Sequence, residues 1–335
     1  QRQMCIRDRD KDTESIQELV AISRFYGADP DYVIAGGGNT SFKNDTRLWI
    51  KASGIALATI AEDGFVCMSR TLLNRIGEKQ YSRDPVKREA EVKQALSMAV
   101  ITPKELRPSV ETSLHNILDF AYVVHTHPTL VNGMLCSLKA AETVSELFGE
   151  DALYVEYTDP GYTLFKKLET EILRYRQKYI DDPHVIFLEN HGIFTGADSV
   201  EEIREINQDL IVRTEKQLTP PGVIEDLPYN PLLNQVLPAM RMLLTEEKSK
   251  IIRYRHNTLI ANYYSNQHEF HKISLPLIPD TIVYCKTRFL YIEHSSTSER
   301  ILESLRIQLP RFKNEYGYLP KVIVMKDMGI FAVED

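Results

Sequence analysis

The sequence predicts an α/β fold in which helices cover both faces of a mixed or antiparallel sheet in three layers, followed by a smaller α/β region. Short apolar runs, such as residues 122–125 and 185–188, alternate with longer segments of helical periodicity. The pattern changes after Pro220-Pro221-Gly222, which we take as a domain boundary. A chain of 335 residues that is 43% hydrophobic has room for one large domain, or for a medium domain and a small one.

The elements before this boundary follow from local signals. A first helix is expected from Thr13, where apolar residues take helical spacing, to Gly27, a natural stop. Asp84-Pro85 predicts a helix start, because Asp caps the helix and Pro suits its first position. A glycine-rich loop is expected over 36–41, strands over 47–51, 65–68, 122–125, 153–157 and 185–188, and further helices over 112–119, 129–138, 162–179 and 199–217.

The two ends of the chain are interpreted separately. Residues 1–12 are charged and aperiodic, so we expect a non-native or disordered tail there, before a main domain over 13–219. Residues 223–335 predict a small C-terminal α/β region, and its end directly after a strand-like run makes truncation one interpretation. Its expected helices are 231–244, 250–264 and 296–316, the last interrupted at Pro310, and its expected strands are 281–286, 289–293, 322–325 and 330–333.

Composition argues against several classes of protein. The net charge of −7 disfavours a broad nucleic-acid surface, which needs a basic excess. No apolar run approaches the roughly 20 residues of a membrane-spanning helix, and no signal peptide opens the chain. The four cysteines have no CxxC spacing and read as reduced thiols. We therefore expect a cytoplasmic protein without a membrane or nucleic-acid partner.

Three histidines carry the main functional signal. Side chains on a strand alternate, so His125 and His127, at the end of the apolar run 122–124, project from one face. His191 follows a second apolar run and can be a third ligand, which leaves one position of a divalent metal open for substrate. The alternative is that these histidines only cap loops or bond to the backbone.

Further motifs stand around the histidines in a fixed order. They are Gly38-Asn39-Thr40-Ser41, Lys51-Ala52-Ser53-Gly54, Ser109-Val110-Glu111, His125-Thr126-His127 and Asn190-His191-Gly192. In this order they resemble the class II aldolase/adducin family over roughly residues 13–217. The residues in these motifs are most similar to those in the aldolase part of bacterial rhamnulose-phosphate aldolase/dehydrogenase fusions. The resemblance implies a class II aldolase-like sandwich and cyclic homotetramers, which light scattering would test.

The resemblance also implies the chemistry. One Zn²⁺ per chain would be held by His125, His127 and His191, and would stabilise an enediolate. Glu111 stands where the family's catalytic acid/base stands, whereas related 4-epimerases carry Asp there. The alternative for Glu111 is a helix N-terminal carboxylate that favours the helix dipole. His115, four residues later, is a helix neighbour that can orient Glu111.

The family's phosphate-binding positions match residues that suit an anion, because glycine lets the backbone approach closely. They are Gly38, Asn39, Ser53, Gly54 and Ser109. The glycine-rich loop and the Ser53-Gly54 pair can equally be simple turns. Val110 departs from fuculose-phosphate aldolases, which carry a second Ser there, so the need for phosphate is open. Lys43 and Lys51 are nearby cations, although surface lysines usually have no specific role.

We therefore predict a lyase: a zinc-dependent class II aldolase that cleaves a ketose 1-phosphate of the rhamnulose or fuculose type. The products would be dihydroxyacetone phosphate and an aldehyde. One alternative is a sugar-phosphate 4-epimerase or a decarboxylase on the same scaffold. Of these two, Glu111 disfavours the epimerase. The other is a non-catalytic adducin-like binding module, which the three retained histidines disfavour.

Overall fold

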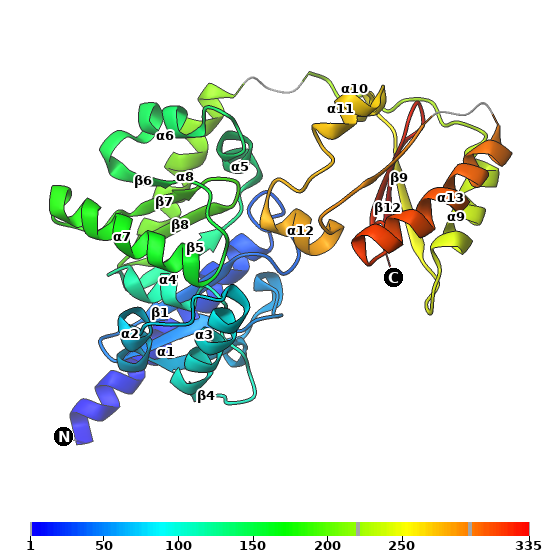
Figure 1. Ribbon diagram of the computed structural model, residues 1–335. Helices are drawn as coiled ribbons and strands as arrows, with labels where there is room; N and C mark the ends of the chain where they lie inside the picture. Colours follow the sequence, from blue (N-terminus) through cyan, green and yellow to red (C-terminus); the bar gives the residue numbers. More distant parts are fainter. Residues whose placement is uncertain (1, 219–221, 294–296, 335) are drawn as a thin grey trace. The chain divides into compact units, whose positions relative to one another are not determined.

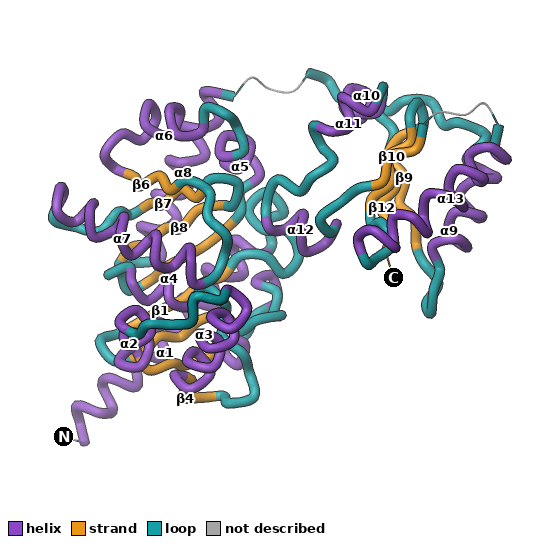
Figure 2. The backbone as a smooth tube through the Cα atoms, in the orientation of Figure 1, coloured by secondary structure: helices purple, strands orange, loops and turns teal. Residues whose placement is uncertain are grey.

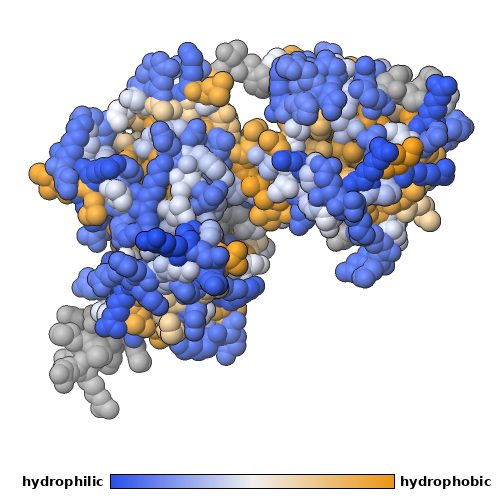
Figure 3. Space-filling view, viewed as in Figure 1, coloured by the Kyte–Doolittle hydropathy of each residue, from blue (hydrophilic) through white to orange (hydrophobic). Residues whose placement is uncertain are grey.

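The computed structural model describes residues 2–218, 222–293 and 297–334 (Figure 1). The chain divides into two compact units, Gln1–Leu218 and Thr219–Asp335, and each is described by itself. Helices and strands alternate through both units (Figure 2). Hydrophilic side chains cover most of the visible surface (Figure 3). Within the described ranges, no helix is both long enough and apolar enough to cross a membrane.

An eight-stranded sheet forms the centre of the first unit. Its order is β4-β3-β2-β1-β5-β8-β7-β6. All neighbours are antiparallel except β6 and β7, which run parallel, so the predicted mixed sheet is confirmed. The strands are β1 (Asn39–Lys43), β2 (Arg47–Lys51), β3 (Phe65–Ser69), β4 (Val100–Thr102), β5 (Tyr122–Thr126), β6 (Ala152–Val155), β7 (Val185–Leu188) and β8 (Gly192–Ala197).

Helices cover both faces of this sheet, because successive strand residues point to opposite sides and both sides are apolar. In β8, Ile193 packs in the cluster with α5, α6 and α8, whereas Phe194 packs in the cluster with α4 and α7. One layer contains α1 (Arg2–Gly27), α5 (Thr129–Leu135), α6 (Ala140–Phe148) and α8 (Val200–Gln217). The other contains α2 (Arg70–Glu78), α3 (Pro85–Ala99), α4 (Thr112–Ile117) and α7 (Tyr162–Tyr179).

Three short 3-10 turns complete the unit: η1 (Leu57–Thr59), η2 (Glu62–Gly64) and η3 (Gly149–Asp151). Helix α7 has the bounds that the sequence predicts. Helix α1 begins at Arg2 rather than at Thr13, so the expected start of the first helix is wrong. The reason is that this segment contains good helix formers and neither Gly nor Pro before Gly27.

The second unit is a smaller α/β fold around a four-stranded sheet of order β10-β11-β12-β9. Its strands are β9 (Ile251–Arg255), β10 (Leu290–Ile292), β11 (Val322–Met325) and β12 (Gly329–Glu334). One face packs against α9 (Leu233–Leu244) and α13 (Ser298–Tyr316). The other face packs against α10 (Thr258–Tyr264) and α11 (Gln267–His271), and α12 (Pro279–Cys285) follows.

Three expectations for this unit are wrong. Residues 281–286 fall largely in helix α12 rather than a strand, because Pro279 suits a first helical turn and the Thr281 hydroxyl accepts from the Ile278 N–H. The expected helix over 250–264 is strand β9 followed by α10. Helix α13 continues through Pro310, whose exposed position lets water satisfy the carbonyl that the proline leaves without a partner.

Candidate functional site

His125 is fixed at the end of a central strand. Strand β5 lies between β1 and β8, and the His125 ring is fully buried and stacks on Phe194 with centroids 4.2 Å apart. Its Nδ1 lies 2.8 Å from the Ile193 carbonyl oxygen. A carbonyl only accepts, so Nδ1 carries the proton and Nε2 keeps its lone pair. Burial also lowers the pKa of His125 well below 6.5, which favours the neutral, ligating form.

His191 reaches the same place from the tight turn between β7 and β8. Asn190 has a φ of +54°, and the His191 N–H donates to the Leu188 carbonyl at 3.2 Å. The Asn132 amide donates to the His191 carbonyl, also at 3.2 Å. Gly192 then lets the backbone pass close to β5, because a Cβ at this position would lie 2.4 Å from the Thr126 carbonyl oxygen. The turn therefore aims His191 at the end of β5.

The three imidazoles converge, and their geometry fits a metal. One ligand atom from each of His125, His127 and His191 lies within 4.8 Å of the others, and all three residues are buried. The Nε2 atoms of His125 and His127 are 3.0 Å apart. A zinc–nitrogen distance of about 2.0–2.1 Å places tetrahedral ligands about 3.3 Å from each other, so this spacing suits nitrogens that share one divalent ion.

Glu111 points into the same cluster. Its Oε1 lies 3.4 Å from the His125 Nε2 and 3.3 Å from the His191 Nε2. Although burial alone would raise its pKa, His125, His191 and the hydrogen bond from Asn39 hold the pKa of Glu111 well below 4.5. Glu111 is the N-cap residue of α4, yet its side chain makes no capping hydrogen bond. Its carboxylate therefore faces the histidines and does not cap helix α4.

Three of the predicted anion-binding residues lie next to Glu111. Gly38 has a φ of +66°, and a Cβ there would lie 2.8 Å from the His125 carbonyl oxygen, so glycine is required. Asn39 donates through Nδ2 to Glu111 Oε2 at 2.6 Å, and its Oδ1 contacts His115. The Ser109 hydroxyl accepts from the Glu111 N–H at 3.2 Å. Asn39 thus already has partners on both of its side-chain polar atoms.

The other two predicted anion-binding residues lie in an exposed turn. Ser53 and Gly54 follow β2, and Gly54 has a φ of +88°. The Ser53 N–H donates to the Arg107 carbonyl at 2.8 Å, which joins this turn to the segment before Ser109. A cavity of about 250 Å³ opens here, lined in part by Ser53, Arg107 and Val110. The turn therefore borders an open space beside the segment that leads to Glu111.

Two lysines are buried where a surface position is the ordinary expectation. Lys43 Nζ donates to the His115 carbonyl at 3.0 Å, and burial lowers the pKa of Lys43 to about 7. Lys51 Nζ donates to the carbonyls of Ile55 at 2.8 Å and Gly36 at 3.3 Å, and burial lowers the pKa of Lys51 to about 8. Both side chains hold backbone that surrounds the site. Their positions at the ends of β1 and β2, close to the glycine-rich and Ser53-Gly54 motifs, were the only sequence signal for this.

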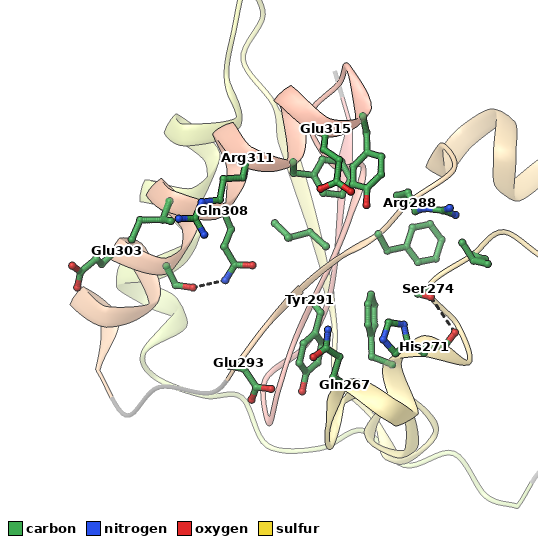
Figure 4. Close-up of a pocket in the computed structure, with 18 of the residues that line it drawn as sticks. Gln267, His271, Ser274, Arg288, Tyr291, Glu293, Glu303, Gln308, Arg311 and Glu315 are labelled. Carbon is green, nitrogen blue, oxygen red and sulfur yellow. Dashed lines mark hydrogen bonds between the residues drawn. The ribbon is translucent and has the colours of Figure 1, made fainter.

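The second unit has a larger cavity of about 1000 Å³ between α11, β10 and α13 (Figure 4). Arg288, Arg300 and Arg311 line it together with three glutamates. Three cations and three anions leave its described lining without an excess of charge that would select an ion. The only buried group of metal-ligating residues in the described ranges is the histidine cluster of the first unit, which is therefore the stronger catalytic candidate.

Several known proteins are similar to parts of this chain. The model of the class II aldolase and adducin N-terminal domain matches residues 17–210, more than half of the chain. The uncharacterized oxidoreductase YuxG of Bacillus subtilis is 26% identical over 90% of this chain, and the chain spans about half (46%) of that relative's length.

Two solved structures are similar to part of this chain. The N-terminal class II aldolase domain of a conserved protein from Thermoplasma acidophilum is 26% identical, with a TM-score of 0.51 over 60% of this chain and 92% of that one. An L-fuculose 1-phosphate aldolase is 22% identical, with a TM-score of 0.42 over 64% of this chain and 90% of that one.

Proposed function

Because the chain belongs to the class II aldolase and adducin family, we propose that it is a zinc-dependent aldolase of ketose 1-phosphates. The sugar would be of the rhamnulose or fuculose type, and the products would be dihydroxyacetone phosphate and an aldehyde. One observation carries the proposal: a buried carboxylate, Glu111, lies 3.3–3.4 Å from two members of a three-histidine cluster. The fourth position that such a cluster leaves open is the place for substrate oxygens.

His125, His127 and His191 would hold the ion, and three imidazole ligands in a reaction that needs no redox change suit zinc. When bound, the ion supplies Lewis-acid stabilisation of the negative charge that develops on substrate oxygen. The protein's own part is to keep these imidazoles oriented. The Ile193 carbonyl does so for His125, because it binds the Nδ1 proton.

Glu111 would act as the acid/base that transfers a proton to or from the carbon next to the substrate carbonyl. Bond formation requires a base that removes a proton from the carbon next to the carbonyl. In cleavage, a proton leaves the hydroxyl group that becomes the aldehyde as the carbon–carbon bond breaks, and a proton is then delivered to the carbon next to the carbonyl. The carboxylate rests ionised because its pKa lies well below 4.5, so it is ready to act as that base. Burial at 7% exposure keeps bulk water from competing for the transfer.

The anionic end of the substrate would meet Gly38, Ser53, Gly54 and Ser109. Backbone at Gly38 and Gly54 can approach an anion closely, and the two serines offer hydroxyl groups. Ser53 borders the cavity of about 250 Å³, which leaves room for a phosphate beside the site. Asn39 would join them only through the second hydrogen of its amide, because its other contacts are to Glu111 and His115.

The test is metal content followed by release of dihydroxyacetone phosphate from a panel of ketose 1-phosphates. We expect about one zinc per chain and cleavage of at least one sugar. Glu111→Gln should keep zinc and lose roughly 10²–10⁴-fold in kcat, because a positioned acid/base contributes that much. His127→Ala should lose both zinc and cleavage.

His184→Ala is the matched control, because this half-buried histidine bonds the Gly196 carbonyl and is not part of the cluster. It should leave zinc and kcat unchanged. Zinc without cleavage of any member of the panel would reject the aldolase and favour an epimerase or decarboxylase. A stable fold without zinc would favour an adducin-like binding module.

A further inference from the structure

A chain of buried hydrogen bonds runs from strand β1 to Glu111. The Ser41 hydroxyl lies 2.8 Å from His115 Nδ1, His115 Nε2 contacts Asn39 Oδ1, and Asn39 Nδ2 lies 2.6 Å from Glu111 Oε2. All four side chains are buried, with exposed fractions of 7% or less. Burial limits the access of water to these groups, and each of the bonds must have a donor on one side and an acceptor on the other.

The direction of every proton in this series of hydrogen bonds follows from the Asn39 amide, which donates through Nδ2 to Glu111 Oε2. The other polar atom of the amide, Oδ1, can only accept. The Asn39 oxygen then faces His115 Nε2, which must carry a proton to donate. Burial lowers the pKa of His115 to about 3, so the ring holds a single proton and its Nδ1 is bare. Ser41 therefore donates to Nδ1.

We infer that His115 is a positioning residue for Glu111, acting through Asn39. Its Nε2–H fixes which way the Asn39 amide points, and the amide nitrogen then binds Glu111 Oε2. With Oε2 occupied, the other oxygen, Oε1, is the one directed at His125 and His191. The role is an extension of the proposed function, because it matters only where Glu111 performs catalysis.

The surroundings of His115 hold this arrangement in place. Register pairs Asn39 with His125 across β1 and β5, so Asn39 and Ser41, two residues apart, present their side chains on one face of β1. His115 sits in α4 one turn after Glu111, and its N–H donates to the Glu111 carbonyl at 3.2 Å. Lys43 Nζ binds the His115 carbonyl at 3.0 Å, and the ring packs edge-on against Phe194.

The activity test compares His115→Phe with His115→Gln. Phenylalanine keeps a ring against Phe194 but cannot donate to Asn39, so kcat should fall about 10–100-fold, as loss of an orienting partner usually does, with KM nearly unchanged. The glutamine amide can still donate to Asn39 Oδ1, so His115→Gln should recover most of kcat. His184→Phe is the control for replacing another internal histidine that contacts a phenylalanine, and it should keep wild-type kcat.

A direct measurement does not depend on the substrate. In protein labelled with ¹⁵N at histidine, long-range ¹H–¹⁵N spectra should show His115 with a proton on Nε2 and none on Nδ1. A proton on Nδ1 would reverse the direction of the hydrogen bonds from Ser41 to Glu111 and overturn the inference, whether or not the protein is an aldolase. Failure of the wild type to cleave any sugar would instead count against the proposed function alone.

Two further outcomes bear on the inference. Wild-type kcat in a folded His115→Phe protein would overturn it. An equal loss in His115→Phe and His115→Gln would also overturn it, because it would show that the ring is needed for packing and not for its donor. Thermal unfolding of each variant, followed by circular dichroism, establishes that the compared proteins are folded.

Discussion

Gly192 has no space for a side chain, and the reason lies in the site itself. A Cβ at this position would lie 2.4 Å from the Thr126 carbonyl oxygen and 2.6 Å from His127 Cδ2. The residue stands directly after His191 and at the start of β8. A single methyl group would therefore push on His127, a member of the histidine cluster, and on the backbone of the strand that precedes it.

We expect Gly192→Ala to lower the free energy of unfolding by about 1–3 kcal/mol, the usual cost of overpacking, and to reduce zinc content. Urea unfolding and metal analysis measure the two effects. Gly133→Ala is the matched control: it lies in helix α5, nothing stands within 4 Å of its Cβ, and it should stabilise by about 0.5–1 kcal/mol. Equal behaviour of the two variants would contradict the steric argument.

Single residues differ in how far the sequence reveals them. The order of the motifs pointed to Glu111 and the three histidines, and the structure brings these four together. The burial of Lys43 and Lys51 was not visible, because lysine is ordinarily exposed and only the surrounding fold shows what encloses it. The double use of Asn39 was also hidden, since its partners are 72 and 76 residues away.

At the scale of elements, local signals worked where a cap or a long periodic run exists. Helices α3 and α7 begin as predicted, and Asp84 is the N-cap of α3. Helix α8 begins at Val200, one residue later than expected, with Ser199 as its N-cap. Local signals failed where short apolar runs fit either state, as in α12 and β9. Strand β8 was missed because Gly192 and Gly196 dilute its pattern, although both allow close packing against neighbouring groups.

The cap of α8 gives a test at this scale. The Ser199 hydroxyl accepts from the Glu202 N–H at 3.2 Å, so Ser199→Ala should lower the free energy of unfolding by about 1 kcal/mol. Ser97→Ala is the comparison, because Ser97 lies inside α3 and its hydroxyl only bonds back to the Lys93 carbonyl. That change should be nearly neutral in the same chemical denaturation experiment. A neutral Ser199→Ala would mean that packing alone fixes the start of α8.

For the whole molecule, the first unit contains everything that the proposed site requires. The histidine cluster, Glu111 and the chain through His115 all lie before Leu218, within the first compact unit. The four hydrophobic clusters that pack against the eight-stranded sheet also draw only on residues before Leu218. The unit therefore has its own core and its own site.

We expect a fragment of residues 1–218 to fold alone, to unfold cooperatively and to bind zinc as the full chain does. Circular dichroism and metal analysis of the purified fragment check this, with the same fragment carrying His127→Ala as the control. A fragment that is unfolded, or that lacks zinc when the full chain contains it, would show that residues 219–335 are needed to complete the first unit.

The pairing of Asn39 with His125 has a consequence for how the protein folds. A slip of one residue between β1 and β5 would turn Asn39 to the opposite face, and His191 arrives only when β8 has paired with β5. The ligands and the groups that orient them thus come together only in the completed sheet. Binding of the proposed ion and folding of this unit would then be linked equilibria: the ion would stabilise the native sheet by mass action, and chains with a shifted register would not gain that stabilisation.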